Sequence, residues 1–211
     1  MSTTRVQLID KNTTVGTAAA EDTKIVFDGN AQDFHIGIDD STDLLKIGGG
    51  TTLGDAMIAI DSAGAVTKPL QPAFLVQPTS VQSDFNQGQS VAVVFGTERF
   101  DLNADFASNT FTAPVTGKYR FDISIKVNGL STQDSATYYY WTLVTSNRSY
   151  YHLSSVNELG SGNAGFTFSG SILADMDASD TASVTIIMGG TSGSGPSDIS
   201  NDTYWSGNLV C

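Results

Sequence analysis

Apolar and polar residues alternate with a period of two along much of the C-terminal part of the chain. The alternation is clearest after Gly117, which we expect to lie in a turn, where apolar residues occupy every second position: Tyr119, Phe121, Ile123 and Ile125. This period places successive side chains on opposite faces of a β-strand. Together with repeated turn residues, it predicts one antiparallel β-sandwich with almost no helix over residues 72–211. We expect its core to include these side chains: Val93, Phe95, Phe121, Ile123, Ile172, Ile186 and Leu209.

Residues 23–67 show a different pattern, in which short apolar runs are separated by turns rich in Asp and Gly. The runs are Ile25–Phe27, Phe34–Ile38, Leu44–Ile47 and Met57–Ile60. Each run is too short to fold alone. We therefore predict a short β-rich stem over residues 23–68, whose strands need partner chains to bury their apolar faces.

The chain divides where two prolines stand close together. Pro69 and Pro72 disfavour helix and favour extended backbone, so we assign residues 69–72 to a linker and residues 73–211 to a head domain. Residues 1–22 are polar and lack periodicity. Because they have too little apolar surface to offset the entropy of ordering in an isolated chain, we expect an arm that docks on another protein or on adjacent copies.

The formal net charge of −12 and the single cysteine limit the functions and the sources of stability that the chain can have. An acidic surface repels phosphate backbones and anionic membranes, so we expect neither nucleic-acid binding nor membrane insertion. No apolar run approaches the length of about 20 residues that a membrane-spanning helix needs. Cys211 has no intrachain partner for a disulfide, so stability must come from core burial and from oligomerisation.

Two runs of residues resemble a known fold. Phe111–Phe121 contains the pattern Gly-x-Tyr-x-Phe, and Trp205–Leu209 stands where the same family has Phe-Ser-Gly-x-Leu, with Trp in place of Phe. Both runs resemble the globular heads of the complement component 1q and tumour necrosis factor superfamily, which are trimeric jelly rolls. The resemblance implies an all-β jelly-roll head, a homotrimer and a role in recognition. It does not specify the partner, because this fold serves many functions.

The stem carries a second resemblance. The segments Phe34–Asp40 and Ile60–Pro69 are similar to the Gly- and Asp-punctuated segments that precede C-terminal knobs in fibre proteins of tailed bacteriophages. This resemblance implies a structural protein on the surface of a virion, a trimeric knob or short fibre that contributes to host attachment. Its N-terminal arm would hold it to other virion proteins. The alternative is a capsid or tail decoration protein that stabilises the particle without binding a receptor.

Residues that could perform catalysis or hold a metal are sparse. His35 and His152 lie in different segments and in no metal-binding spacing. The aspartates of Asp39–Asp43 could provide the carboxylate pair of a glycosidase, and those of Asp175–Asp180 could bind Ca²⁺ through oxygen. Since Asp also favours turns between short strands, we assign both groups to turns and predict no enzyme activity, no cofactor and no metal.

A run of aromatic residues provides the candidate contact surface. Six of them lie within a short stretch: Tyr138, Tyr139, Tyr140, Trp141, Tyr150 and Tyr151. On strands, half of these side chains face the core and half face solvent or a neighbouring subunit. The loop Gly189–Pro196 contains Gly193 and Gly195, and glycine lets a backbone approach a ligand closely. We expect these aromatic residues and glycines to contact a host-surface glycan or protein.

Overall fold

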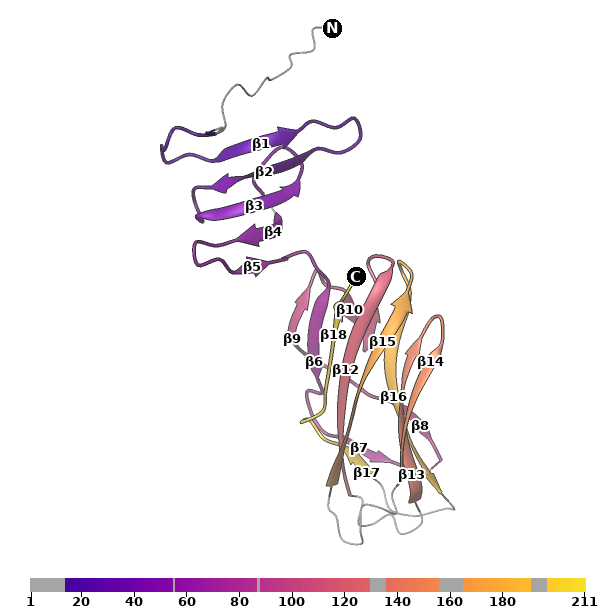
Figure 1. Cartoon of the computed structure of the whole chain (residues 1–211). Helices are drawn as coiled ribbons and strands as arrows, with labels where there is room; N and C mark the ends of the chain where they lie inside the picture. Colours follow the sequence, from indigo (N-terminus) through magenta and orange to yellow (C-terminus); the bar gives the residue numbers. More distant parts are fainter. Residues whose placement is uncertain (1–13, 55, 87, 130–135, 156–164, 191–196) are drawn as a thin grey trace. The chain divides into compact units, whose positions relative to one another are not determined.

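The computed structural model describes residues 14–54, 56–86, 88–129, 136–155, 165–190 and 197–211. Every regular element in these residues is a β-strand (Figure 1), which confirms the predicted all-β class. The same residues contain no helix that could cross a membrane. The chain divides into two compact units, Met1–Leu70 and Gln71–Cys211. The division falls inside the stretch that the prolines marked as a linker.

The first unit is a single antiparallel sheet built as a meander. Its strands have the same order in the chain and in the sheet: β1 (Thr23–Phe27), β2 (Phe34–Asp39), β3 (Leu44–Gly49), β4 (Ala56–Ile60) and β5 (Val66–Thr67). All neighbouring strands are antiparallel. Each apolar run that the sequence analysis assigned to the stem lies within one of the first four strands.

Aspartate side chains fix the turns of this sheet. Asp61 Oδ1 accepts two backbone N–H groups in the turn between β4 and β5. Between β2 and β3, Asp39 Oδ1 accepts hydrogen bonds from the N–H and the hydroxyl of Ser41, and Lys46 Nζ donates to Asp39 Oδ2 over 2.5 Å. The hydrogen bond from Lys46 holds the pKa of the Asp39 carboxyl far below its usual value. These contacts support the assignment of Asp39–Asp43 to a turn.

The second unit consists of two antiparallel sheets. One has the order β10 (Phe106–Ala107), β11 (Thr110–Thr112), β16 (Thr181–Gly190), β13 (Ala136–Thr145) and β14 (Ser149–Ser155), with β8 (Ser90–Ala92) also paired to β16. The other has the order β7 (Gln82–Phe85), β17 (Ser197–Ile199), β12 (Gly117–Asn128), β18 (Tyr204–Leu209), β6 (Ala73–Gln77) and β9 (Thr97–Leu102), with β15 (Gly165–Met176) paired to β12. In chain order, β6 is the first strand of the second unit and β18 is the last, and these two strands lie side by side (Figure 1). This arrangement is the predicted jelly-roll sandwich.

The core of the second unit is dominated by aromatic rings. Phe74 on β6 lies at their centre, and its ring centroid is 5.0 Å from those of both Phe111 and Trp205. All three side chains are buried. Of the predicted core residues, Ile172 and Leu209 are partly buried against the core and the others are buried within it. The predicted core is therefore confirmed.

Two glycines in the runs that resemble the complement 1q heads are required by close packing. Gly207 on β18 pairs with Phe121 on one side and with Phe74 on the other. A Cβ at this position would lie 2.6 Å from Phe74 Cε1 and 2.7 Å from Phe121 Cδ1, so glycine leaves the room that both rings need. Gly117 does not lie in a turn as predicted, because its backbone is paired as the first residue of β12. A Cβ on Gly117 would lie 2.6 Å from Leu209 Cδ1.

We predict that Gly207→Ala destabilises the second unit by about 1–3 kcal/mol, because the added methyl group must displace packed rings. Unfolding in guanidinium chloride, followed by tryptophan fluorescence, measures this change. Ser206→Ala is the matched control, because the neighbouring side chain lies on the other face of the strand and its loss should cost less than about 0.5 kcal/mol. Equal stability of the two variants would contradict the packing role of Gly207.

Asp105 is a carboxylate that the fold accommodates poorly. Its Oδ2 atom is buried without a hydrogen-bond partner. Burial, and to a smaller extent the charge of Asp101, raises the pKa of Asp105 above its usual value of 3.8. Because the folded state favours the protonated form, the contribution of Asp105 to stability is fully present below its unfolded-state pKa. This contribution is lost as the pH rises through the higher folded-state pKa.

We predict that Asp105→Asn makes the second unit more stable than the native chain at pH 7, and that the difference vanishes at about pH 3. Denaturant unfolding at the two pH values measures this. Asp101→Asn is the control, because the Asp101 carboxylate accepts the N–H groups of Asp105 (3.2 Å) and Phe106 (3.0 Å) and its replacement should destabilise the unit at pH 7. The burial argument fails if Asp105→Asn brings no gain at pH 7.

Candidate functional site

The aromatic run that the sequence analysis predicted as a contact surface lies on β13 and β14. β13 is placed between β14 and β16, and its residues alternate between the core and the outer face of the sheet. Tyr139 and Trp141 are buried, which corrects their prediction as contact residues. The alternation turns both rings into the sandwich, where Tyr139 stacks on Phe168 at 5.2 Å and Trp141 stacks on His152 at 5.1 Å.

Tyr138, Tyr140 and Tyr151 lie on the outer face in one contiguous row, here called the tyrosine ladder. The rings of Tyr138 and Tyr140 are stacked, with centroids 5.9 Å apart and planes inclined by 8°. Tyr140 meets Tyr151 edge to face, with centroids 5.8 Å apart. Tyr151 pairs with Thr142 and is therefore diagonal to Tyr140, a position from which large side chains reach each other across strands. Tyr151 is 69% exposed.

The tyrosine ladder rests on neighbours in the same sheet. Gly189 on β16 pairs with Tyr138, and a Cβ there would lie 2.0 Å from Tyr138 Cζ. The ring therefore occupies the space that a side chain at Gly189 would take. Ile187 and Leu153 pair with Tyr140 on its two sides, and Leu153 is 67% exposed. The result is an apolar surface of rings and aliphatic side chains that also carries phenolic hydroxyls.

Tyr150, another predicted contact residue, does not belong to the tyrosine ladder. Tyr150 on β14 is partly buried against the core, and its hydroxyl donates to Asp175 Oδ1 at 3.3 Å. Burial raises the pKa of Tyr150, and Arg148 Nη2 holds the same aspartate at 2.8 Å. Tyr150 therefore links β14 to β15. Gly193 and Gly195 lie outside the described residues, so their contacts stay predictions.

The aspartates that follow β15 form a turn. Asp180 Oδ2 accepts the backbone N–H of Asp177 at 2.8 Å, and the N–H of Asp180 donates to Asp177 O at 3.0 Å. Asp175 is engaged by Arg148 and Tyr150. Across the part of the chain that the structure describes, no three His, Cys, Asp or Glu side chains are grouped so that they could hold a metal ion. The hydrogen bonds between Asp177 and Asp180 support the turn assignment.

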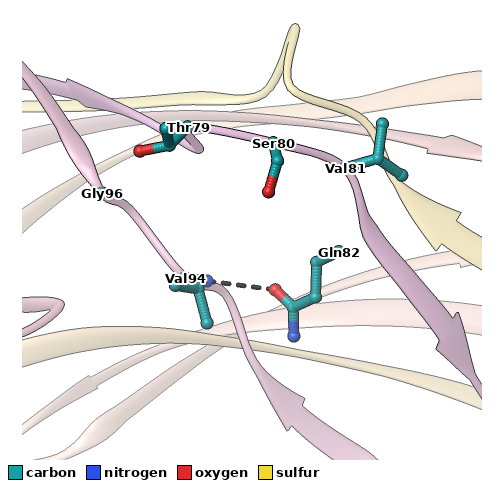
Figure 2. Close-up of a pocket in the computed structure, with 6 residues that line it drawn as sticks. All are labelled: Thr79, Ser80, Val81, Gln82, Val94 and Gly96. Atoms are coloured by element: carbon teal, nitrogen blue, oxygen red, sulfur yellow. Dashed lines mark hydrogen bonds between the residues drawn. The ribbon is translucent and has the colours of Figure 1, made fainter.

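The second unit contains a hollow with a volume of about 210 Å³. Figure 2 shows the residues that line it. Its lining consists of Thr79, Ser80, Val81, Gln82, Val94 and Gly96. The side-chain oxygen of Gln82 accepts the N–H of Val94 at 3.1 Å, and its amide group donates to Ala92 O at 2.9 Å. Gln82 is thus engaged within the protein, and none of the lining side chains is ionisable. We assign no chemistry to this hollow.

Solved structures resemble this chain in fold. No protein-family model and no curated protein sequence matches it. The globular domain of zebrafish complement 1qA protein is 18% identical with a TM-score of 0.47, over 67% of this chain and 98% of that one. Murine APRIL, in a crystal structure at pH 8.0, is 10% identical with a TM-score of 0.47, over 66% of this chain and 99% of that one.

We predict that truncation of the tyrosine ladder and truncation of the core have very different effects on stability. Tyr151→Ala should lower the free energy of unfolding by less than about 1 kcal/mol, because it removes a cross-strand contact from an exposed ring. Trp141→Ala should lower it by about 3–5 kcal/mol, because it removes a fully buried ring. Urea unfolding followed by circular dichroism measures both. A loss of similar size in the two variants would show that Tyr151 belongs to the structural core.

Proposed function

We propose that this protein is a non-catalytic structural protein on the surface of a tailed-phage virion, where it forms a homotrimeric knob or short fibre and attaches to a host-surface glycan. The tyrosine ladder is the observation that carries the attachment function. The similarity of the stem to segments of phage fibre proteins supports the place on the virion.

The tyrosine ladder has the properties of a carbohydrate-binding surface. An aromatic ring offers a large flat contact area at low conformational cost, and the tyrosine hydroxyl adds a hydrogen bond at its edge. Because Tyr138, Tyr140 and Tyr151 stand on paired strands, their rings are held in place before a ligand arrives and little entropy is lost on binding. The net charge of −12 favours a neutral or basic glycan over a polyanionic one.

Exposed apolar side chains on the head support assembly into a homotrimer. Phe100 and Leu102 lie on β9, and Leu173 lies on β15. β9 and β15 form opposite edges of one sheet. Contact between one edge of a subunit and the other edge of the next is heterologous, and such contacts close into a ring when the rotation between subunits allows it. Three copies present three tyrosine ladders, which strengthens binding that is weak at each site.

The second candidate is a capsid or tail decoration protein that stabilises the particle without binding a receptor. Exposed apolar side chains on both units, among them Phe27 and Leu173, favour it because surfaces of this kind are covered by neighbouring proteins in assemblies. Under either function, we propose that residues 1–22 anchor the protein to other virion proteins. The described part of this arm, residues 14–22, is exposed throughout.

Binding of the full-length protein to an array of neutral, basic and acidic glycans tests the attachment function. We expect the double variant Tyr140→Ala/Tyr151→Ala to bind about tenfold more weakly or worse, since two lost stacking contacts are worth about 1–3 kcal/mol. Tyr204→Ala is the matched control, because Tyr204 is an exposed tyrosine on β18 in the other sheet. This control should bind like the native chain.

Adsorption of particles that carry the same variants separates the two functions. Loss of adsorption by intact Tyr140→Ala/Tyr151→Ala particles supports attachment through the tyrosine ladder. Unchanged adsorption of particles that have become less stable would contradict it and favour the decoration function.

A further inference from the structure

One face of the sheet in the first unit is built from apolar side chains. Strand pairing places the following residues on one side: Ile25, Phe27, Phe34, Ile36, Ile38, Leu45, Ile47, Ile58, Ile60 and Val66. A bulge between β3 and β4 adds Met57, whose Cε lies 3.3 Å from the position of a Cβ on Gly49. The other strand positions on this side are Thr23 and Gly49. This side, here called the apolar face, therefore carries no charged strand residue.

The opposite face of the sheet, here called the polar face, carries the charged strand residues together with Val26, Leu44, Ala56 and Ala59. The chain itself covers part of it. Asp39 and Lys46 form an ion pair there that is largely shielded from solvent. His35 is buried, and its Nδ1 lies 3.0 Å from Gly50 O. Leu53 is buried as well. The segment that follows β3 thus covers part of the polar face. Within the described residues of the first unit, most of the apolar face has no such cover; at its edges, Gln32 Nε2 lies 3.3 Å from the position of a Cβ on Gly49, and a Cβ on Gly16 would lie 3.0 Å from Thr23 Oγ1.

The apolar face is unusually exposed. Phe27 is 60% exposed, Val66 59% and Ile38 52%. Five strands about 4.8 Å apart, with an average of about five residues that each rise about 3.4 Å, give a face of about 400 Å². Apolar patches of about 300–600 Å² are the largest that monomers commonly expose, and they are often functional. A sheet with one uncovered apolar face also lacks the second layer around which domains build a core.

We propose that the apolar face packs against the same face of other copies of this chain, so that the first unit is an oligomerisation surface in addition to the head. The inference rests on the proposed homotrimer, because copies joined through their heads hold their first units at a high effective concentration. This proximity strengthens the contact, because about 400 Å² per copy is less than the roughly 800 Å² per partner of a standard stable interface.

The shape of the first unit favours a copy of the chain, and its charge disfavours anionic lipid. The apolar face is rich in isoleucine, and branched side chains interdigitate well between two sheets packed about 10 Å apart. The turns around it are acidic and carry Asp28, Asp33, Asp40 and Asp61. Such a rim is repelled by an anionic membrane. Every copy exposes the same apolar face, so copies of the chain can cover one another's apolar faces in a fixed stoichiometry.

Cross-linking of the full-length protein tests this inference. In a Cys211→Ser background, Leu45→Cys places the single thiol on the apolar face. Val26→Cys, on the opposite face, is the matched control, because Leu45 is 37% exposed and Val26 36%. Under mild oxidation we expect disulfide-linked dimers of Leu45→Cys to form about tenfold faster or more than those of Val26→Cys. Val66→Cys repeats the test on β5 if circular dichroism shows that Leu45→Cys perturbs folding.

Three results would overturn the inference. The first is an equal rate of cross-linking at Leu45→Cys and Val26→Cys. The second is a Leu45→Cys thiol that resists both cross-linking and a maleimide, because it shows that the chain covers its own apolar face. The third is flotation of the protein with neutral phosphatidylcholine vesicles, which assigns the face to lipid.

Sedimentation velocity separates this inference from the homotrimer of heads. We expect Ile38→Lys, which puts a charge on the apolar face, to abolish fast cross-linking of Leu45→Cys while the protein stays trimeric and still binds glycan. If the heads alone associate, the native chain is trimeric without fast cross-linking, and the inference fails. If the apolar faces alone associate, Ile38→Lys yields monomers, which supports the inference and refutes trimerisation through the heads.

Discussion

The second unit, which is the predicted head, depends on the position of its last strand. β18 lies between β12 and β6, and Gly207 in this strand leaves the space in which the rings of Phe74 and Phe121 meet. Trp205, two residues earlier, packs edge to face on Phe74. The core therefore closes when the end of the chain pairs with the strand that begins the unit. Contacts between such distant segments form slowly, because a long loop must close before they stabilise the fold.

The strand period that builds this core also fixes the candidate binding surface. Tyr139 and Trp141 are locked between the sheets, so Tyr138 and Tyr140 must point outward. A shift of one residue in the pairing of β13 would exchange the two pairs, exposing a tryptophan ring and turning two phenols into the core. The cost of that exchange holds the tyrosine ladder in place. The geometry of the surface is thus set by burial beneath it and does not depend on a ligand.

Local patterning predicted the core well and the surface less well. The alternation around Phe121 was enough to assign buried positions, because apolar side chains at every second position all point to one face of the strand, and that face must be the one that packs on the core. In the aromatic run every residue is large, so the pattern could not predict which of the alternating residues face the core. Pairing with distant strands decides which half is buried. Gly189 was assigned to a glycine-rich loop, yet it lies in β16 opposite Tyr138. The contact of Tyr140 with Tyr151 depends on the register of the β13–β14 hairpin, which composition does not encode.

In the first unit, the sequence predicted both the strands and their need for cover, because each apolar run is short and bounded by turn residues. It could not predict which face stays open. The bulge that adds Met57 to the apolar face arises from backbone pairing between β3 and β4. The cover of the polar face by residues after β3 likewise needs His35 and Gly50 to meet in space.

The two units meet the same physical requirement in different ways. In the second unit each sheet covers the other, so one chain buries its own core, and the tyrosine ladder exists in every folded copy. In the first unit the chain covers part of the polar face of the single sheet, and most of the apolar face has no cover within the described residues of that unit. If other copies supply the missing cover, folding of the first unit is coupled to assembly, and its stability rises with protein concentration. In the second unit, the stability that comes from its own buried core does not depend on protein concentration. Recognition can then be a property of each head, while the order of the stem is a property of the oligomer.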